Sequence, residues 1–467
     1  MTTSRRKLLL TGAASGVAAV TMVAGPAAAA PVDAGFTPAP DLGVTPGGDA
    51  TTNRRNLIAA LSGSSTCVLF PPGDYRLDNS GNTLMVSDFS GRLVMQPGAR
   101  VLLTDNAARG LIFRGGVGAR FSGVTITYVT RPTSRVEKPE PADCLLFLTT
   151  TDTYLEHTRI IGSAAAGLLF WQCTRPMVFD AFITDTMADG LHFANCHDGW
   201  ADHVTTVDTG DDGVAFINYA AQPDATGGLA TNLSVTRSKA RGVCVGGQSG
   251  VTIRDVSIKD TVSPGILCEG HGGWNVRVPT GVTFERVRIV RGGAWLAGGA
   301  DGKVVGARVA TATAVLREVT IEDSLAHGLH CESSTVTVLD VTVKRVTGSP
   351  GSGLVLNTGS YIVDRATVEE VTGIGLSAND CARLEYGTVT LRATARTHPT
   401  RRAVSIENTA FVFGERIWVE DTGPRVIGTY EPKRRQRGSL GTIVDVNRDV
   451  VVLDNVSKLS VVEVDPA

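Results

Sequence analysis

The chain has 467 residues, and its 44 Lys and Arg nearly balance its 46 Asp and Glu, which gives a formal net charge of -2. Nucleic acids and anionic membranes usually select a basic surplus, so this balance does not support either as a partner. The length would suit two or three average domains or one solenoid built from repeats. Nothing in the sequence indicates an oligomeric state.

The first 30 residues differ from the rest and predict an export signal. Arg5 and Arg6 precede Lys7, an apolar stretch rich in small residues follows, and a run of alanines ends before Pro31. This order is typical of a signal that is removed after export. The segment around the two arginines resembles a bacterial twin-arginine signal. We expect a secreted protein without membrane contact after signal removal, because no other apolar stretch reaches 18 residues.

The segments after the signal predict a lead-in and one large domain. Residues 31–41 are rich in Pro and Ala and predict a flexible lead-in, while residues 42–467 predict a single domain. Residues 51–61 predict a short amphipathic helix, and a strand and turn follow at residues 67–75. We expect the helix to cap the N-terminal end of a strand stack, because exposed strand edges invite aggregation.

A six-residue pattern centred on glycine recurs along the chain. Its copies are AAGLLF, ADGLHF, DDGVAF, ARGVCV, SPGILC, RGGAWL, AHGLHC, GSGLVL and GIGLSA. The first and third residues after the glycine are mostly apolar, a period of two that is typical of a strand with one buried face. Such short strands become stable only when repeats stack. The pattern therefore predicts an all-β fold, a right-handed parallel β-helix or solenoid, in which the glycine allows a positive φ or a close backbone approach.

The eight cysteines show no CxxC or CxxH spacing, so the sequence does not predict a zinc site. Cys268 and Cys331 fall at inward-facing positions of the repeat. This placement favours buried free thiols over disulfides, although an even count in an exported chain would permit pairing.

Residues at one offset from the glycines should lie on adjacent turns, about 4.8 Å apart. Asp189, Asp212 and Arg241 directly precede three successive glycines, and several ionisable side chains fall within reach of them: Asp211, His192, Glu269 and His271. Crowded carboxylates raise the pKa of one of their number, and glycoside hydrolysis needs a protonated carboxyl beside an ionised one. Asp-Gly is also common at ordinary turns, but acids, an Arg and a His together favour a site.

Two inserted loops, residues 218–232 and 270–280, follow strands of this region and would wall a groove over it. They carry Tyr219 and Trp274, and Trp171 lies one turn before Asp189 on the outward face. Aromatic rings suit the faces of sugars, although each ring could equally hold its own loop in place. Substrate contacts are predicted for His192, Trp171, Tyr219, His271 and Trp274.

Two stretches resemble known families. Residues 43–77, with a Phe-Pro-Pro-Gly-x-Tyr turn, are similar to the start of pectate lyase superfamily proteins, and ADGLHF followed by DDGVAF resembles polygalacturonase-type glycoside hydrolases. The second resemblance implies that Asp189, Asp211 and Asp212 are the catalytic aspartates. Two later positions depart from that family, because Arg241 replaces a histidine and Glu269 replaces a lysine. Glu269 would repel a galacturonate, so we expect a neutral polysaccharide or oligosaccharide as the substrate.

The sequence is compatible with three functions. A hydrolase would use Asp212 or Asp189 as general acid and Asp211 or Glu269 as base, with Arg241 as an orienting cation and no cofactor. A polysaccharide lyase would use Arg241 as the base and Asp189 and Asp212 as Ca²⁺ ligands. A non-catalytic glycan-binding solenoid would use only the aromatic rings.

Overall fold

The computed structural model describes residues 35–466, except for residues 139, 271–274, 295–303, 349–350, 396–401, 421, 423–424, 431–436 and 446–457. All named elements lie in one compact unit formed by residues 37–467. The predicted export signal at residues 1–30 lies outside the described residues. No helix in the described part of the chain is both long enough and apolar enough to cross a membrane.

The strands form two parallel sheets. The shorter sheet has 14 strands: β4 (Met85–Ser87), β7 (Leu111–Arg114), β10 (Leu145–Leu148), β12 (Leu168–Trp171), β14 (Leu191–Ala194), β16 (Val214–Ile217), β18 (Val243–Gly246), β20 (Ile266–Glu269), β22 (Val305–Ala310), β24 (His327–Glu332), β27 (Ser352–Asn357), β29 (Leu376–Asn379), β31 (Arg402–Glu407) and β33 (Arg425–Tyr430).

The longer sheet has 21 strands: β1 (Thr37–Pro38), β2 (Cys67–Phe70), β3 (Gly73–Leu77), β5 (Arg92–Met95), β6 (Ala99–Leu103), β8 (Arg120–Ser122), β9 (Thr125–Tyr128), β11 (Tyr154–Ser163), β13 (Met177–Thr186), β15 (Trp200–Thr209), β17 (Leu229–Ser238), β19 (Thr252–Thr261), β21 (Val282–Val290), β23 (Thr313–Glu322), β25 (Thr335–Val338), β26 (Val341–Val346), β28 (Ser360–Val371), β30 (Arg383–Thr394), β32 (Phe411–Glu420), β34 (Arg437–Asp445) and β35 (Lys458–Pro466).

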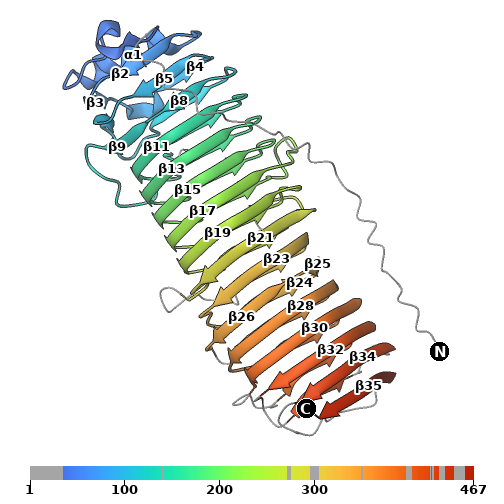
Figure 1. Cartoon of the computed structure of the whole chain (residues 1–467). Coiled ribbons are helices and arrows are strands. Elements are labelled where there is room, and N and C mark those ends of the chain that lie inside the picture. Colours follow the sequence, from blue (N-terminus) through green and yellow to red (C-terminus); the bar gives the residue numbers. More distant parts are fainter. Residues whose placement is uncertain are drawn as a thin grey trace. The chain divides into compact units, whose positions relative to one another are not determined.

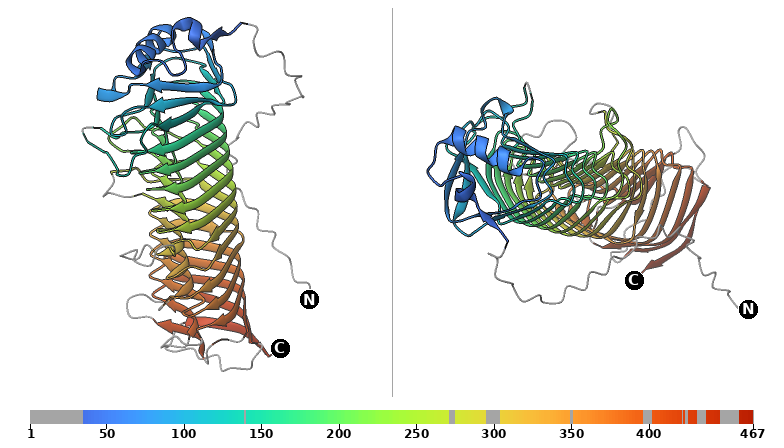
Figure 2. Two further views of the ribbon diagram at one scale, coloured as in Figure 1. Left: turned by 90° about the vertical axis from the view of Figure 1, so that its left-hand side faces the viewer. Right: turned by 90° about the horizontal axis from the view of Figure 1, so that it is seen from above.

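Successive strands of each sheet pair in parallel, one turn of chain apart, and the stacked turns are visible in Figure 1 and, from two further sides, in Figure 2. In the shorter sheet Leu168 pairs with Leu191, which in turn pairs with Val214. This is the parallel β-helix that the sequence predicts. Between successive glycine copies the longer sheet has single ten-residue strands such as β19, in which Asp255 has a positive φ of 56°.

The core lies between the two sheets and contains a ladder of phenylalanines from the shorter sheet. The rings of Phe170, Phe193 and Phe216 stack face to face, with centroids 5.4 and 4.8 Å apart, and none of the three is exposed. The eight cysteines are all free, and Cys268 and Cys331 are fully buried, which confirms that prediction.

We expect Phe193→Ala to lower the free energy of unfolding by about 3–5 kcal/mol, because it removes a buried ring and leaves a cavity between its two stacked neighbours. Urea denaturation followed by circular dichroism measures the loss. Phe411→Ala is the matched control, since Phe411 is 47 % exposed and its removal should cost far less. Equal losses in the two variants would contradict the prediction.

The repeat glycines allow close backbone approach rather than a positive φ. A Cβ atom added to Gly190 would lie 2.6 Å from the carbonyl oxygen of Gly213 and 2.7 Å from Cγ2 of Thr206. Gly213 is similarly crowded by Gly242 of the next turn. Positive φ values occur instead at polar residues such as Asp185 and Asp208, near the ends of the long strands. Stacked turns thus leave room only for glycine beside the aspartates.

The N-terminal part of the unit is more ordered than the sequence predicts. Residues 37–41, expected to be flexible, lie in β1, which pairs with β2, and in the 3-10 helix η1 (Ala39–Leu42). Helix α1 (Ala50–Leu61) confirms the predicted helix, although it begins earlier, where Asp49 accepts a hydrogen bond from the Thr52 amide at 2.8 Å. Its role as a cap of the open end stays a prediction.

Candidate active site

The register of the shorter sheet places Asp189, Asp212 and Arg241 on three adjacent turns. Leu191 pairs with Val214, which pairs with Val243, so the residues two places before the first strand residue also align. The amide of Gly190 donates to the carbonyl oxygen of Asp212, and the amide of Gly213 donates to that of Arg241, both at 2.9 Å. The glycine pattern therefore brings these three side chains to one place.

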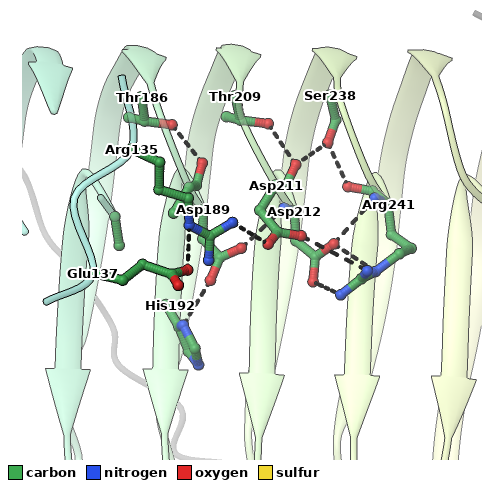
Figure 3. A network of polar contacts seen from close by, with 12 residues as sticks. Arg135, Glu137, Thr186, Asp189, His192, Thr209, Asp211, Asp212, Ser238 and Arg241 are labelled. Atoms are coloured by element: carbon green, nitrogen blue, oxygen red, sulfur yellow. Dashed lines mark hydrogen bonds and ion pairs between the residues drawn. The ribbon is translucent and has the colours of Figure 1, made fainter. Parts of the chain in front are cut away.

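Hydroxyl groups at the ends of the long strands fix the turns that carry these residues (Figure 3). Thr209 Oγ1 donates to the carbonyl oxygen of Asp211 at 3.1 Å, and Ser238 Oγ donates to that of Arg241 at 2.7 Å. Thr186 Oγ1 makes the corresponding bond to Ala188 at 2.8 Å. Each hydroxyl is buried, so each turn is held rigidly.

Asp189 is held as an ionised carboxylate. Its Oδ1 accepts from the amide of Asp212 at 2.9 Å, and its Oδ2 lies 2.7 Å from Nδ1 of His192. Burial acts to raise the pKa of Asp189, but His192 and the amide outweigh burial and hold it below its ordinary value. Burial conversely acts to lower the pKa of His192, and Asp189 raises it overall. The two side chains therefore form a buried ion pair.

Asp212 is the most buried of the three aspartates, and its pKa is raised. It is only 2 % exposed, and its carboxylate oxygens lie 2.6 and 2.8 Å from Nε and Nη2 of Arg241. Burial raises the pKa of Asp212 to about 7 against the opposing effect of Arg241, and Asp189 and Asp211 raise it further. Arg241 keeps its proton, because Asp212 and the other acids raise its pKa although burial acts to lower it.

Asp211 is the more accessible carboxylate, with a side chain that is 25 % exposed. Its Oδ2 lies 2.8 Å from Nη1 of Arg135, and its Oδ1 lies 3.7 Å from Nη1 of Arg241. Arg135 comes from the segment between β9 and β10, where its Nε also lies 2.7 Å from Oε1 of Glu137 (Figure 3). This segment reaches across the acids from a turn far earlier in the chain.

The three aspartates could offer oxygen ligands to a cation, because one carboxylate oxygen of each lies within 4.8 Å of the others. Ca²⁺ takes six to eight oxygens, more than the one oxygen from each carboxylate that comes together here. Arg241 already neutralises Asp212, and Arg135 already binds Asp211. The cluster is therefore better described as carboxyls paired with guanidinium groups than as a calcium site.

A cavity of about 520 Å³ lies over these groups, within the usual size range of ligand sites. Its lining includes seven of the predicted residues: Asp189, Asp211, Asp212, Arg241, His192, Trp171 and Tyr219. The rings of Trp171 and Tyr219 stack on each other with centroids 5.9 Å apart, so the two form one aromatic wall of the cavity.

One predicted residue in the described part of the chain is not brought to the cavity. Glu269 is not among its lining residues, and its Oε1 lies 3.6 Å from Nη2 of Arg308 instead. Trp171 and Ile217 end β12 and β16 just as Glu269 ends β20, and both line the cavity. Glu269 is therefore left out by its turn, which lies two strands beyond β16 in the sheet. His271 and Trp274 lie outside the described residues.

Sequence reasoning missed Arg135, Glu137 and Asp143, which also line the cavity. Asp143 occupies the same column as Asp189, two turns earlier, because β10 pairs with β12 and β12 with β14. Burial raises the pKa of Asp143 to about 7, although the Ala166 amide acts to lower it. The segment ADCLLF could have indicated that Asp143 belongs to this column. It was not recognised as a copy of the repeat because Cys144 stands where the other copies have glycine.

Because the pKa values of Asp143 and Asp212 are raised, we expect the protein to be more stable at pH 5 than at pH 8. The unfolded chain releases these protons near pH 4 whereas the folded chain keeps them to about pH 7, so raising the pH favours unfolding. His192 acts in the same direction, because its raised pKa gives stability that is lost at higher pH. We expect a loss on the order of 2 kcal/mol for each aspartate.

Urea denaturation at the two pH values tests this expectation. Asp143→Asn should remove the contribution of Asp143 and so reduce the difference between pH 5 and pH 8. A free energy of unfolding that rises from pH 5 to pH 8 would contradict it.

No protein-family model matches the chain, and no curated protein matches it. Several solved structures are similar in fold. The A-module of the mannuronan C-5 epimerase AlgE4 from Azotobacter vinelandii is 13 % identical with a TM-score of 0.44, and the match covers 66 % of this chain and 96 % of that one. A GH87 alpha-1,3-glucanase from Streptomyces thermodiastaticus is 17 % identical with a TM-score of 0.41, over 89 % and 70 %. A family 28 exopolygalacturonase from Yersinia enterocolitica is 12 % identical with a TM-score of 0.41, over 86 % and 78 %.

Proposed function

We propose that the protein is a secreted glycoside hydrolase that cleaves a neutral polysaccharide or oligosaccharide. The proposal rests on the different pKa values of the neighbouring aspartates. Asp212 has a pKa of about 7, so it is protonated in about half of the molecules at neutral pH, while Asp189, within 4.8 Å of it, is held ionised. A protonated and an ionised carboxyl side by side are the two groups that glycoside hydrolysis requires.

The environments of the carboxyls support separate roles. Asp212 is the proposed general acid, because it is the carboxyl that carries a proton to donate to the leaving oxygen. Asp211 is the proposed base or nucleophile, because its side chain is the most exposed of the three. Asp189 binds His192 and the Asp212 amide. We therefore assign it two roles: it positions Asp212, and it stabilises the positive charge that develops on the sugar.

Arg241 is the residue that a lyase would use as a base, and its surroundings favour the hydrolase over the lyase. A base must accept a proton, but Arg241 is paired with Asp212 at 2.6 Å and its pKa lies above the ordinary value of an arginine. Its fixed guanidinium suits an orienting and charge-balancing role. The poor fit of the cluster to Ca²⁺ also disfavours the lyase.

Digestion of a panel of neutral and uronate-containing glycans, with and without a chelator, tests the proposal. A hydrolase releases new reducing ends without ultraviolet-absorbing products, and the chelator has no effect. A lyase would release absorbing products in a calcium-dependent way. A well-folded sample that acts on none of the glycans would support the non-catalytic, glycan-binding alternative.

A further inference from the structure

Asp143 presents an unused hydrogen-bonding group to the cavity. The side chain is 2 % exposed, and its Oδ1 accepts from the Ala166 amide at 3.0 Å. Its Oδ2 is buried and has no hydrogen-bond partner among the described residues. A buried carboxyl oxygen without a partner is costly and calls for an explanation, which a ligand in the cavity would supply. The proposed hydrolytic chemistry makes no use of Asp143.

His192 presents a second unused group to the same cavity. Its Nδ1 is bound to Asp189, but its Nε2 is buried and has no partner among the described residues, while the side chain as a whole is 11 % exposed. The ion pair with Asp189 keeps the ring protonated, so Nε2 carries a hydrogen to donate. Asp189 also fixes the orientation of the ring. Both unused polar atoms are therefore held in place by bonds to the protein.

The surface between Asp143 and Asp189 suits a sugar ring. The two residues are two turns apart in one column, about 9.6 Å at the spacing of adjacent strands. Ala166 fills the intervening turn with a side chain of one carbon, and Leu169 and Trp171 belong to the same apolar cluster. A pyranose combines apolar faces with hydroxyl groups at its edge, which matches an apolar floor with polar groups beside it.

The charges around the cavity favour a neutral ring. Five carboxyl groups line it, from Glu137 and from four aspartates, against the guanidinium groups of Arg135 and Arg241. Arg135 is paired with Asp211 and Glu137, and Arg241 is paired with Asp212. A uronate would place its carboxylate among these acids without a guanidinium to itself.

We propose that Asp143 and His192 form a binding subsite for a neutral sugar ring, which lies over Ala166 next to the three aspartates. The subsite rests on the proposed function, since it holds the ring beside the bond to be cleaved. The Oδ2 hydroxyl of Asp143 and the Nε2–H of His192 both donate to hydroxyl or ring oxygens of the sugar.

Binding of oligosaccharides to the full chain tests the subsite separately from catalysis. Titration calorimetry is carried out in an Asp212→Asn background, so that no ligand is consumed, with neutral gluco- and galacto-oligosaccharides and with oligogalacturonates as probes. We expect a neutral oligosaccharide to bind, Asp143→Ala to weaken its binding by about fivefold to tenfold, and Asp143→Asn to restore most of the affinity, because the amide replaces the donor. Asp74→Ala is the matched control, since Asp74 is an exposed carboxyl paired with Arg100.

The outcomes separate the subsite from the reaction. Unchanged binding in Asp143→Ala, tighter binding of oligogalacturonates than of neutral probes, or no binding of any neutral probe would each overturn the subsite, even if the protein hydrolyses a glycan. Binding of a neutral probe that depends on Asp143 supports the subsite, even if no reducing ends are released in the activity assay. Thermal unfolding of each variant shows whether lost binding reflects lost folding.

Discussion

Asp212→Asn is expected to lower the rate of glycan cleavage by about a thousandfold while substrate binding persists. The amide cannot donate a proton to the leaving oxygen, and general acid catalysis supplies factors of roughly 10²–10⁴. Asn keeps the shape of Asp, and its side-chain oxygen can still accept from the amide and Nε of Arg241, whereas the bond from Nη2 is lost. The substitution removes one of three crowded carboxyls but also the ionised partner of Arg241, so thermal unfolding of the variant is measured beside its rate.

Release of reducing ends and calorimetric binding, measured on the same samples, separate the two effects of this substitution. Asp208→Asn provides the matched control, because Asp208 is paired with Arg237 at 2.6 Å on β15 and does not line the cavity. Asn also tolerates the positive φ of 55° at that position. Cleavage by Asp212→Asn within tenfold of the unsubstituted protein would exclude Asp212 as the general acid.

The repeat made the strand stack and the column of Asp189, Asp212 and Arg241 predictable. Both follow from one local rule. The glycine of each repeat must pack against the next turn, so residues at a fixed sequence distance from it take a fixed position on the sheet. The same rule wrongly placed Glu269 in the site. That residue obeys the register, but β20 lies two strands beyond β16, whose last residue Ile217 still lines the cavity, and Arg308 binds Glu269 there.

The parts of the site that escaped prediction come from long-range packing or from a broken pattern. Arg135 bonds to Asp211, 76 positions later in the chain, across a segment with no repeat signal of its own. Asp143 obeys the register, but Cys144 stands in the place of the glycine that would have marked it. Protonation states depend on burial by these residues as well, so a sequence could indicate crowded acids but not which one keeps its proton.

Arg241→Met is expected to lower the free energy of unfolding by about 3–5 kcal/mol at pH 8, because it leaves Asp212 as a buried charge without its partner. The loss should be smaller at pH 5. Without the guanidinium the pKa of Asp212 in the folded protein rises further above its unfolded value, so the folded chain protonates Asp212 at the lower pH and avoids the buried charge.

A double substitution shows whether the missing partner is the cause of this loss. Arg241→Met combined with Asp212→Leu replaces both charges by apolar groups and should recover most of the stability that Arg241→Met loses, because a buried ion pair is often replaceable but a buried lone charge is not. Urea denaturation of both variants and of Asp212→Leu at pH 5 and pH 8 completes the cycle. Strictly additive losses, equal at the two pH values, would mean that Arg241 stabilises the fold by packing alone and that the charge of Asp212 is balanced by other groups.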